Sequence, residues 1–263
     1  MIHELPASIA RLTENLPFTT DSTGMSGSEI RLYPDFVLKI EKSSDQAHGL
    51  AEMLRFLEGR LPAPKLLACE EMNGFQYLLM SRIPGKMSCS EDLMDRSDDL
   101  LRLIAEGLRM LWQVDITDCP RFLGPEPMLK RARYYIENDL FDASDCDPST
   151  FVPEGFESPL ALLEWLETHI PPMDPVFSHG DYCMPNLMIR DGKISGFIDL
   201  GMSGIADRWV DISLMHRSLA SNFGGAYGGK VYPDFNADRL FDFLGIEPDY
   251  DKLRYYKLLD ELF

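Results

Sequence analysis

A cluster of polar residues in the last third of the chain has the types and spacing needed for phosphoryl transfer. It consists of His179-Gly180-Asp181, then Asn186 five residues after the aspartate, and Asp199 thirteen residues after Asn186. Moving a phosphoryl group requires a group that orients the attacking hydroxyl and accepts its proton, and a metal ion that neutralises the phosphates. Asp181 suits the first role, and Asn186 and Asp199 carry the oxygen ligands that Mg²⁺ prefers. A His-Gly-Asp alone could be a turn around a buried histidine, and we expect His179 itself to be structural, so the hypothesis depends on the whole set.

These residues must be positioned by a hairpin and by the elements around it. Residues 187–198 predict a β-hairpin that turns at Asp191-Gly192, because an Asp-Gly pair between two apolar runs favours a two-residue turn. Asn186 precedes the first strand of this hairpin and Asp199 follows the second. The two side chains are therefore expected to approach a metal ion from adjacent elements.

The rest of the chain changes character near residues 81–85. Before that point, alternating apolar residues predict a hairpin over 30–40, with Val37 and Lys39 on the second face, and a buried strand at 77–80. Between them, apolar residues at helical spacing predict a helix over 50–61 that ends at a Leu-Pro-Ala-Pro segment. After that point helical patterns dominate, over 100–112, 128–140 and 158–170. The sequence thus predicts a strand-rich N-terminal lobe and a mainly helical C-terminal lobe.

The motifs H-G-D-x-x-x-x-N and F-I-D-x-G resemble the catalytic loop and metal-binding aspartate of the aminoglycoside phosphotransferases, which are relatives of the protein kinases. The segments at 204–211 and 258–263 resemble the 3′-phosphotransferase branch, and the resemblance covers nearly the whole chain. It implies an α+β, two-lobed, protein-kinase-like fold, with a nucleotide-binding lobe at 1–81 and a catalytic and substrate-binding lobe at 82–263. It also implies transfer of the γ-phosphate of ATP to an aminoglycoside hydroxyl, with the 3′-hydroxyl expected, GTP possible and Mg²⁺ as the metal. The expected consequence is antibiotic resistance.

The same resemblance implies a nucleotide site in the N-terminal lobe. Ser26, in a Gly- and Ser-rich turn, would donate to the phosphates, as such turns can aim several N–H groups at anionic oxygens. Lys39 would pair with the α- and β-phosphates, and Ser81 and Ile83, at the expected connector, complete the predicted nucleotide contacts. The family holds its lysine with a helix glutamate, where this chain has Leu50. Glu52 is the nearest acid and is assigned as the partner, although it lies about 200° round the helix from Leu50.

The substrate end departs from the family pattern at three positions. The family has an arginine at the place of Met202, and two acids that line its aminoglycoside pocket appear here as Ser221 and Asn222. The predicted acidic contacts that remain are Asp147, Glu261 and the carboxylate of Phe263. Fewer negative groups imply altered recognition of a polycation.

Composition agrees with a small cationic substrate and disfavours other partners. The chain has 43 acidic residues, 25 basic residues and a formal net charge of −18. Such a chain repels nucleic acid and attracts cations, although acidity also keeps a protein soluble. We therefore expect no nucleic-acid partner. The chain has five cysteines without C-x-x-C spacing and no basic N-terminal leader, which predicts a cytoplasmic protein. It also has no apolar run of ~20 residues, so no membrane contact is expected.

Two other functions stay open at this stage. One is a kinase for another small hydroxylated metabolite, such as an amino alcohol or a sugar. The other is a catalytically weak nucleotide-binding module, which the missing helix glutamate favours and the complete aspartate and asparagine set disfavours. The sequence leaves the oligomeric state, the choice between ATP and GTP and the acidic partner of the lysine undetermined.

Overall fold

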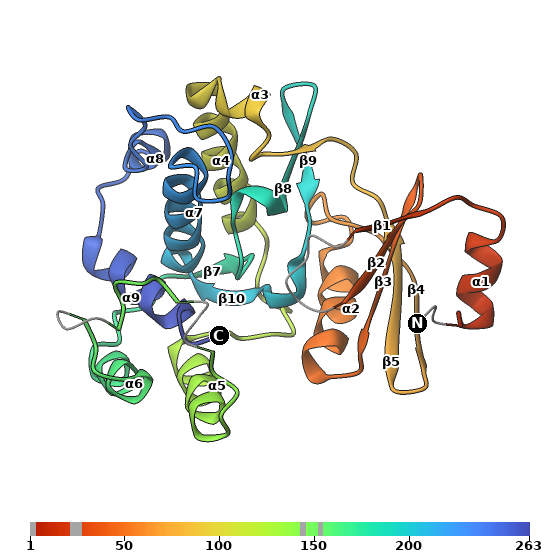
Figure 1. Ribbon diagram of the computed structural model, residues 1–263, viewed down its shortest axis with the longest axis horizontal. Helices are drawn as coiled ribbons and strands as arrows, with labels where there is room; N and C mark the ends of the chain where they lie inside the picture. The colour runs from red at the N-terminus through yellow and green to blue at the C-terminus, as the bar shows by residue number, and fades with distance from the viewer. Residues whose placement is uncertain (1–3, 22–27, 143–145, 152–154) are drawn as a thin grey trace. The chain divides into compact units, whose positions relative to one another are not determined.

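The computed structural model describes residues 4–21, 28–142, 146–151 and 155–263, which form two compact units (Figure 1). The first unit comprises Met1–Met87 and Asn186–Met202, and the second comprises Ser88–Pro185 and Ser203–Phe263. The predicted α+β class, with an antiparallel sheet in the N-terminal part and helices in the C-terminal part, is confirmed.

The first unit is built on a five-stranded antiparallel sheet with the strand order β1-β2-β3-β5-β4. Apolar alternation decides which face is covered, because Leu38 and Ile40 are buried while Lys39 lies on the other face. The register places Lys39 between Ile30 and Leu78. The strands are β1 (Thr19–Asp21), β2 (Glu29–Leu32), β3 (Phe36–Lys42), β4 (Leu66–Met72) and β5 (Phe75–Ser81).

The long helix α2 (Asp45–Leu57) packs against β4 and β5 and against the short 3₁₀ helix η3 (Leu200–Met202). Ser44 caps its start by accepting the N–H of Ala47 at 3.1 Å. The sequence predicted that this helix continues to residue 61, but it ends at Leu57. The reason is local, because Gly59 takes a left-handed φ of 74° that closes the helix.

The predicted hairpin at 187–198 belongs to the first unit. It forms from β8 (Leu187–Arg190) and β9 (Lys193–Phe197), and β6 (Lys86–Met87) pairs with β8. Asp191 and Gly192 both have positive φ, 52° and 72°, as a two-residue turn of this kind requires.

The second unit is mainly helical (Figure 1). In it α7 packs against α9 and β7, α4 against α8 and β7, and α5 against α6. Two strands, β7 and β10, pair antiparallel. The elements are α3 (Glu91–Met94), α4 (Ser97–Trp112), α5 (Pro125–Glu137), α6 (Pro159–Thr168), β7 (Pro175–Ser178), β10 (Gly204–Asp207), α7 (Arg208–Phe223), α8 (Arg239–Leu244) and α9 (Tyr250–Asp260). The N-terminal helix α1 (Ala7–Thr13) lies in the first unit.

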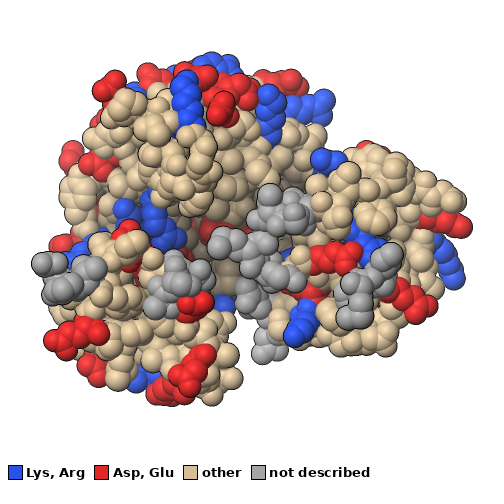
Figure 2. Space-filling view, in the orientation of Figure 1, with Lys and Arg blue, Asp and Glu red and all other residues tan. Residues whose placement is uncertain are grey.

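Acidic and basic side chains are interspersed over the face drawn in Figure 2, so neither sign covers that face alone. All five cysteines are reduced thiols and each is partly exposed. Within the described ranges, no helix is both long enough and apolar enough to cross a membrane.

Candidate active site

The predicted catalytic loop leaves strand β7 at Ser178 and is held by one buried carboxylate. The N–H of His179 donates to Oδ2 of Asp211 at 2.8 Å, and the N–H of Gly180 donates to Oδ1 at 3.0 Å. Gly180 has a φ of 79°, which an L-residue with a side chain rarely adopts. The ring of His179 is buried, and its Nδ1 accepts the N–H of Asp181 at 3.3 Å. His179 therefore orients the loop, as the sequence indicated, and Asp181 follows on a fixed backbone.

Asp211 lies in the first turn of α7 and is fully buried. Burial raises the pKa of its carboxyl to about 6, although the hydrogen bonds from His179, Gly180 and Ser178 act to lower it. Sequence reasoning did not assign this residue. Its signal is weak, because an aspartate near a helix start normally suggests only a helix-dipole effect.

The backbone after Asp181 is fixed by two serines. The N–H of Met184 donates to Oγ of Ser218 at 3.0 Å, and Oγ of Ser88 donates to the carbonyl of Met184 at 2.7 Å. The hydroxyl of Tyr182 donates to the carbonyl of Ile104 at 3.0 Å. Elements far apart in the sequence thus hold the loop at Tyr182 and Met184, and no local pattern identified Ser218 or Ser88.

The two predicted metal ligands lie at the open end of the β8–β9 hairpin. Leu187 pairs with Phe197, and the N–H of Ile198 donates to the carbonyl of Asn186 at 3.0 Å. Asn186 therefore lies opposite the residue that precedes Asp199. Asn186 is buried, whereas Asp199 is exposed and has a left-handed φ of 58°.

This donor set fits Mg²⁺. An amide oxygen and a carboxylate from adjacent strand ends are hard oxygen ligands, and Mg²⁺ bound with a nucleotide completes its octahedron with phosphates and water. Among the residues that the structure describes, no group of three or more His, Cys, Asp or Glu is placed to hold a metal by protein ligands alone.

The acidic partner of Lys39 is Glu41. Nζ of Lys39 lies 3.1 Å from Oε2 of Glu41, with side chains 15% and 19% exposed. Ser28 donates to the same oxygen at 3.4 Å, while Oε1 of Glu41 is buried without a hydrogen-bond partner among the described residues. Glu52, assigned from the sequence, is instead exposed on α2, and Leu50 is buried. The sequence contained a signal for this pair, because Lys39 and Glu41 are two residues apart on one strand and residues at that spacing share a face.

Two of the other predicted nucleotide contacts, Ser81 and Ile83, have clear local roles. Oγ of Ser81 accepts the N–H of Lys65 at 2.8 Å, which ties β5 to the segment before β4. Ile83 packs over Gly196 of β9, where a Cβ would lie 3.0 Å from the isoleucine Cγ2. Ser26 lies outside the described residues.

Two of the three predicted substrate residues contact each other in the second unit, and the third, Phe263, contacts α5 instead. The N–H of Asp147 donates to Oε2 of Glu261 at 2.6 Å. The ring of Phe263 meets Tyr135 edge-on at 6.0 Å and lies under the guanidinium of Arg131. Asp147 is exposed, whereas the side chain of Glu261 is 8% exposed.

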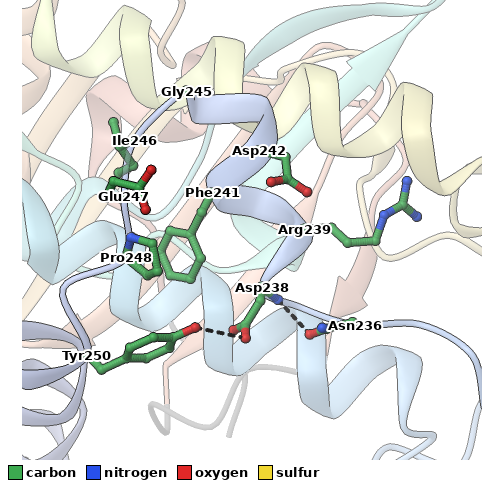
Figure 3. A pocket seen from close by; sticks show the side chains of 10 residues that line it. All are labelled: Asn236, Asp238, Arg239, Phe241, Asp242, Gly245, Ile246, Glu247, Pro248 and Tyr250. Carbon is green, nitrogen blue, oxygen red and sulfur yellow. Dashed lines mark hydrogen bonds between the residues drawn. The ribbon is translucent and has the colours of Figure 1, made fainter.

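A pocket of about 560 Å³ lies around α8 in the second unit (Figure 3). In Figure 3 the hydroxyl of Tyr250 points to the carboxylate of Asp238, and the two are joined by a hydrogen bond of 3.2 Å. None of the predicted site residues lines this pocket. Its lining is Asn236, Asp238, Arg239, Phe241, Asp242, Gly245, Ile246, Glu247, Pro248 and Tyr250.

Comparison with solved structures supports the fold. The chain superposes on the aminoglycoside phosphotransferase APH(3″)-Id from Streptomyces rimosus with a TM-score of 0.78 and 21% identity, covering 98% of this chain and 99% of the other. An aminoglycoside-3′-phosphotransferase of type VIII gives a TM-score of 0.73 with 23% identity, covering 97% of each chain.

Sequence comparison gives the family. Residues 19–256 match the model of the phosphotransferase enzyme family. The aminoglycoside 3′-phosphotransferase of Niallia circulans is 37% identical, with 98% of this chain and 97% of the relative covered. That of Staphylococcus aureus is 35% identical with 97% of both covered, and that of Enterococcus faecalis is 40% identical with 81% and 77% covered. The family model covers most of the chain and these relatives are 35–40% identical to it, so the chain belongs to the aminoglycoside 3′-phosphotransferase family.

Proposed function

We propose that this protein transfers the γ-phosphate of ATP to the 3′-hydroxyl of an aminoglycoside and thereby confers resistance to it. The observation that carries the proposal is the Asp181 loop, whose backbone is held by Asp211 and whose chain runs directly into the Asn186 hairpin. The relatives that are 35–40% identical bear the same activity in their names, which supports the acceptor class.

In the proposed reaction, the acceptor hydroxyl oxygen bonds to the γ-phosphorus. The bond from that phosphorus to the oxygen bridging to the β-phosphate breaks, and ADP leaves. The carboxylate of Asp181 orients the hydroxyl and accepts its proton. Asn186 and Asp199 would hold Mg²⁺, which neutralises charge on the phosphates when it is bound.

At the nucleotide end, Lys39 would pair with the α- and β-phosphates, and Glu41 would hold it in place. The alternative of a non-catalytic nucleotide-binding module was favoured by the missing helix glutamate; the Lys39–Glu41 ion pair gives the lysine an acid and so supports a catalytic protein. We expect ATP as the donor, with GTP as a possible substitute, and we place the reaction in the cytoplasm, where the five thiols stay reduced.

A kinase for another small hydroxylated metabolite is the second candidate, and one observation favours it. Asn222, which stands where the family has an acid, directs its amide to its own helix and donates to the carbonyl of Ser218 at 2.8 Å. A pocket with fewer acids recognises a polycation less strongly, so the acceptor must be tested on a panel.

The test is phosphorylation of kanamycin by ATP, followed by mass spectrometry, with and without Mg²⁺. We expect a product heavier by one phosphoryl group that depends on the metal, and none from an aminoglycoside that lacks a 3′-hydroxyl. Asp181→Asn should lower kcat by about 10²–10⁴ and leave nucleotide affinity nearly unchanged. Phosphorylation of amino alcohols or sugars but of no aminoglycoside would favour the second candidate. An Asp181→Asn variant with more than about half of the wild-type kcat would exclude the catalytic role.

A further inference from the structure

Arg217, on α7, contacts both acids at the end of α9. Its Nη2 makes an ion pair and hydrogen bond with Oδ2 of Asp260, and its Nη1 lies 3.6 Å from Oε1 of Glu261. Burial lowers the pKa of the guanidinium, but the two carboxylates outweigh it and raise the pKa overall. One planar cation therefore fixes two consecutive side chains, which a lysine ammonium cannot do with the same geometry.

Glu261 links the Arg217 ion pair to the segment at Cys146 and Asp147, which lies far away in the sequence. While one of its oxygens faces Arg217, the other accepts the N–H of Asp147 at 2.6 Å, and its carbonyl accepts the thiol of Cys146 at 3.3 Å. Burial raises the pKa of Glu261, and the Asp147 N–H and Arg217 act to lower it. A carboxylate that is only 8% exposed and bound on both oxygens serves mainly to join the two segments.

The segment so joined presents an exposed acid. The carboxylate of Asp147 accepts the N–H of Ser149 at 2.8 Å and its hydroxyl at 2.6 Å, in a turn that defines the direction of the side chain. These hydrogen bonds lower the pKa of Asp147, so the group is ionised at neutral pH. Asp147 and Asp260 are thus two negative groups whose positions both depend on Arg217.

We propose that Arg217 is a positioning residue for the acceptor: it holds the 260–263 segment directly and, through Glu261, the 146–149 turn, so that their acids match the ammonium groups of the substrate. The proposal rests on the proposed function. Charge alone predicts the opposite effect, because removing a cation makes the site more negative and should improve binding of a polycation. Position and charge therefore predict changes of opposite sign in KM.

The decisive experiment compares Arg217→Gln, Arg217→Lys and the wild type in kanamycin phosphorylation at low salt. Arg217→Gln should raise the kanamycin KM tenfold or more and leave the ATP KM within about twofold. Arg217→Lys retains the charge but not the planar guanidinium, so its kanamycin KM should lie between those of the wild type and Arg217→Gln. The matched control is Arg254→Gln, which removes the same charge from an exposed position on α9 and should leave both KM values unchanged.

Hydrogen exchange gives a readout that does not depend on activity. Peptides that cover 146–151 and 258–263 should exchange faster in Arg217→Gln than in the wild type or in Arg254→Gln. A kanamycin KM that stays constant or falls in Arg217→Gln, or exchange that is unchanged in both peptides, would overturn the inference and leave the proposed function intact. A wild type that phosphorylates no aminoglycoside would instead refute the proposed function, and the role of Arg217 in acceptor binding with it.

Discussion

Replacing Ser218 by alanine removes a single oxygen from α7 and isolates one contact of the predicted catalytic loop. Met184 is fully buried, and its N–H donates to Oγ of Ser218 at 3.0 Å. Without that acceptor the N–H stays in the interior unpaired. A buried donor left without its partner costs about 1–3 kcal/mol, and each kcal/mol lowers Tm by roughly 2–4 °C in a chain of this size. Ser218→Ala should therefore lower Tm by about 2–12 °C.

The same helix supplies a matched control. Ser213 is also buried on α7, but its hydroxyl has no hydrogen-bond partner among the described residues. Ser213→Ala removes the same atom and ends the cost of burying an unpaired hydroxyl, so stability should stay constant or rise by up to about 1–3 kcal/mol. Of two identical substitutions five residues apart, the first should thus lower stability and the second should not.

Urea unfolding at neutral pH measures both free energies, and a steady-state assay adds the functional consequence. Because Met184 lies between Asp181 and Asn186, Ser218→Ala should also lower kcat, whereas Ser213→Ala should leave it within about twofold. Unfolding free energies of the two variants within about 0.5 kcal/mol of each other would show that Ser218 does not prevent an unpaired N–H at Met184. The hydrogen bond from Met184 to Ser218 would then not stabilise the loop. The threshold of about 0.5 kcal/mol is the error expected when the effects of independent sites are compared.

Two further predictions concern charged groups. Glu41→Gln should remove the ion pair with Lys39 and raise the ATP KM about threefold to tenfold, while the kanamycin KM stays constant. An equal rise of the ATP KM in Glu52→Gln would show that the acid on α2 is the partner of Lys39. The pKa of Asp211 lies at about 6 in the fold against 3.8 for an unperturbed carboxyl, so the folded protein binds an extra proton between these values. This group therefore adds stability as pH falls from 7 to 4, by at most about 3 kcal/mol, and loses that contribution as pH rises through 6. The unfolding free energies of the wild type and of Asp211→Asn are measured with urea at each pH, and their difference should fall as pH rises. A difference that is constant or that rises with pH would contradict a pKa of Asp211 raised by burial.

Local patterns predicted those parts of the molecule that local physics determines. The Asp191-Gly192 turn fixed the hairpin because few residue pairs accept two positive φ angles in succession. Apolar spacing predicted a helix in this region, but it gave neither the start at Asp45 nor the end at Leu57. The end was missed because Leu61 remains buried outside the helix and continues the apolar pattern. The burial of a residue therefore does not distinguish a position in a helix from a position in a loop.

Long-range contacts escaped the sequence because their partners are far apart along the chain. Asp211 holds a loop about 30 residues before it, and Ser88 bonds a carbonyl 96 residues away. Glu41 was missed for a different reason, since the resemblance directed attention to a helix acid and away from the strand itself. The sequence selected Asp181, Asn186 and Asp199 as site residues, which stays a prediction, but it did not indicate the groups that fix the backbone between His179 and Met184.

The discontinuity of the first unit affects the order in which the protein can fold during synthesis. Its sheet and α2 are complete when Met87 leaves the ribosome, yet 98 residues of the second unit separate them from the β8–β9 hairpin. Until that hairpin arrives, β6 lacks the strand with which it pairs, Pro62 lacks the N–H of Phe197 that its carbonyl accepts, and α2 lacks its contact with η3. The nascent N-terminal segment thus exposes an unpaired strand edge and apolar surface while most of the other unit is being made, the condition under which chains aggregate or require chaperones.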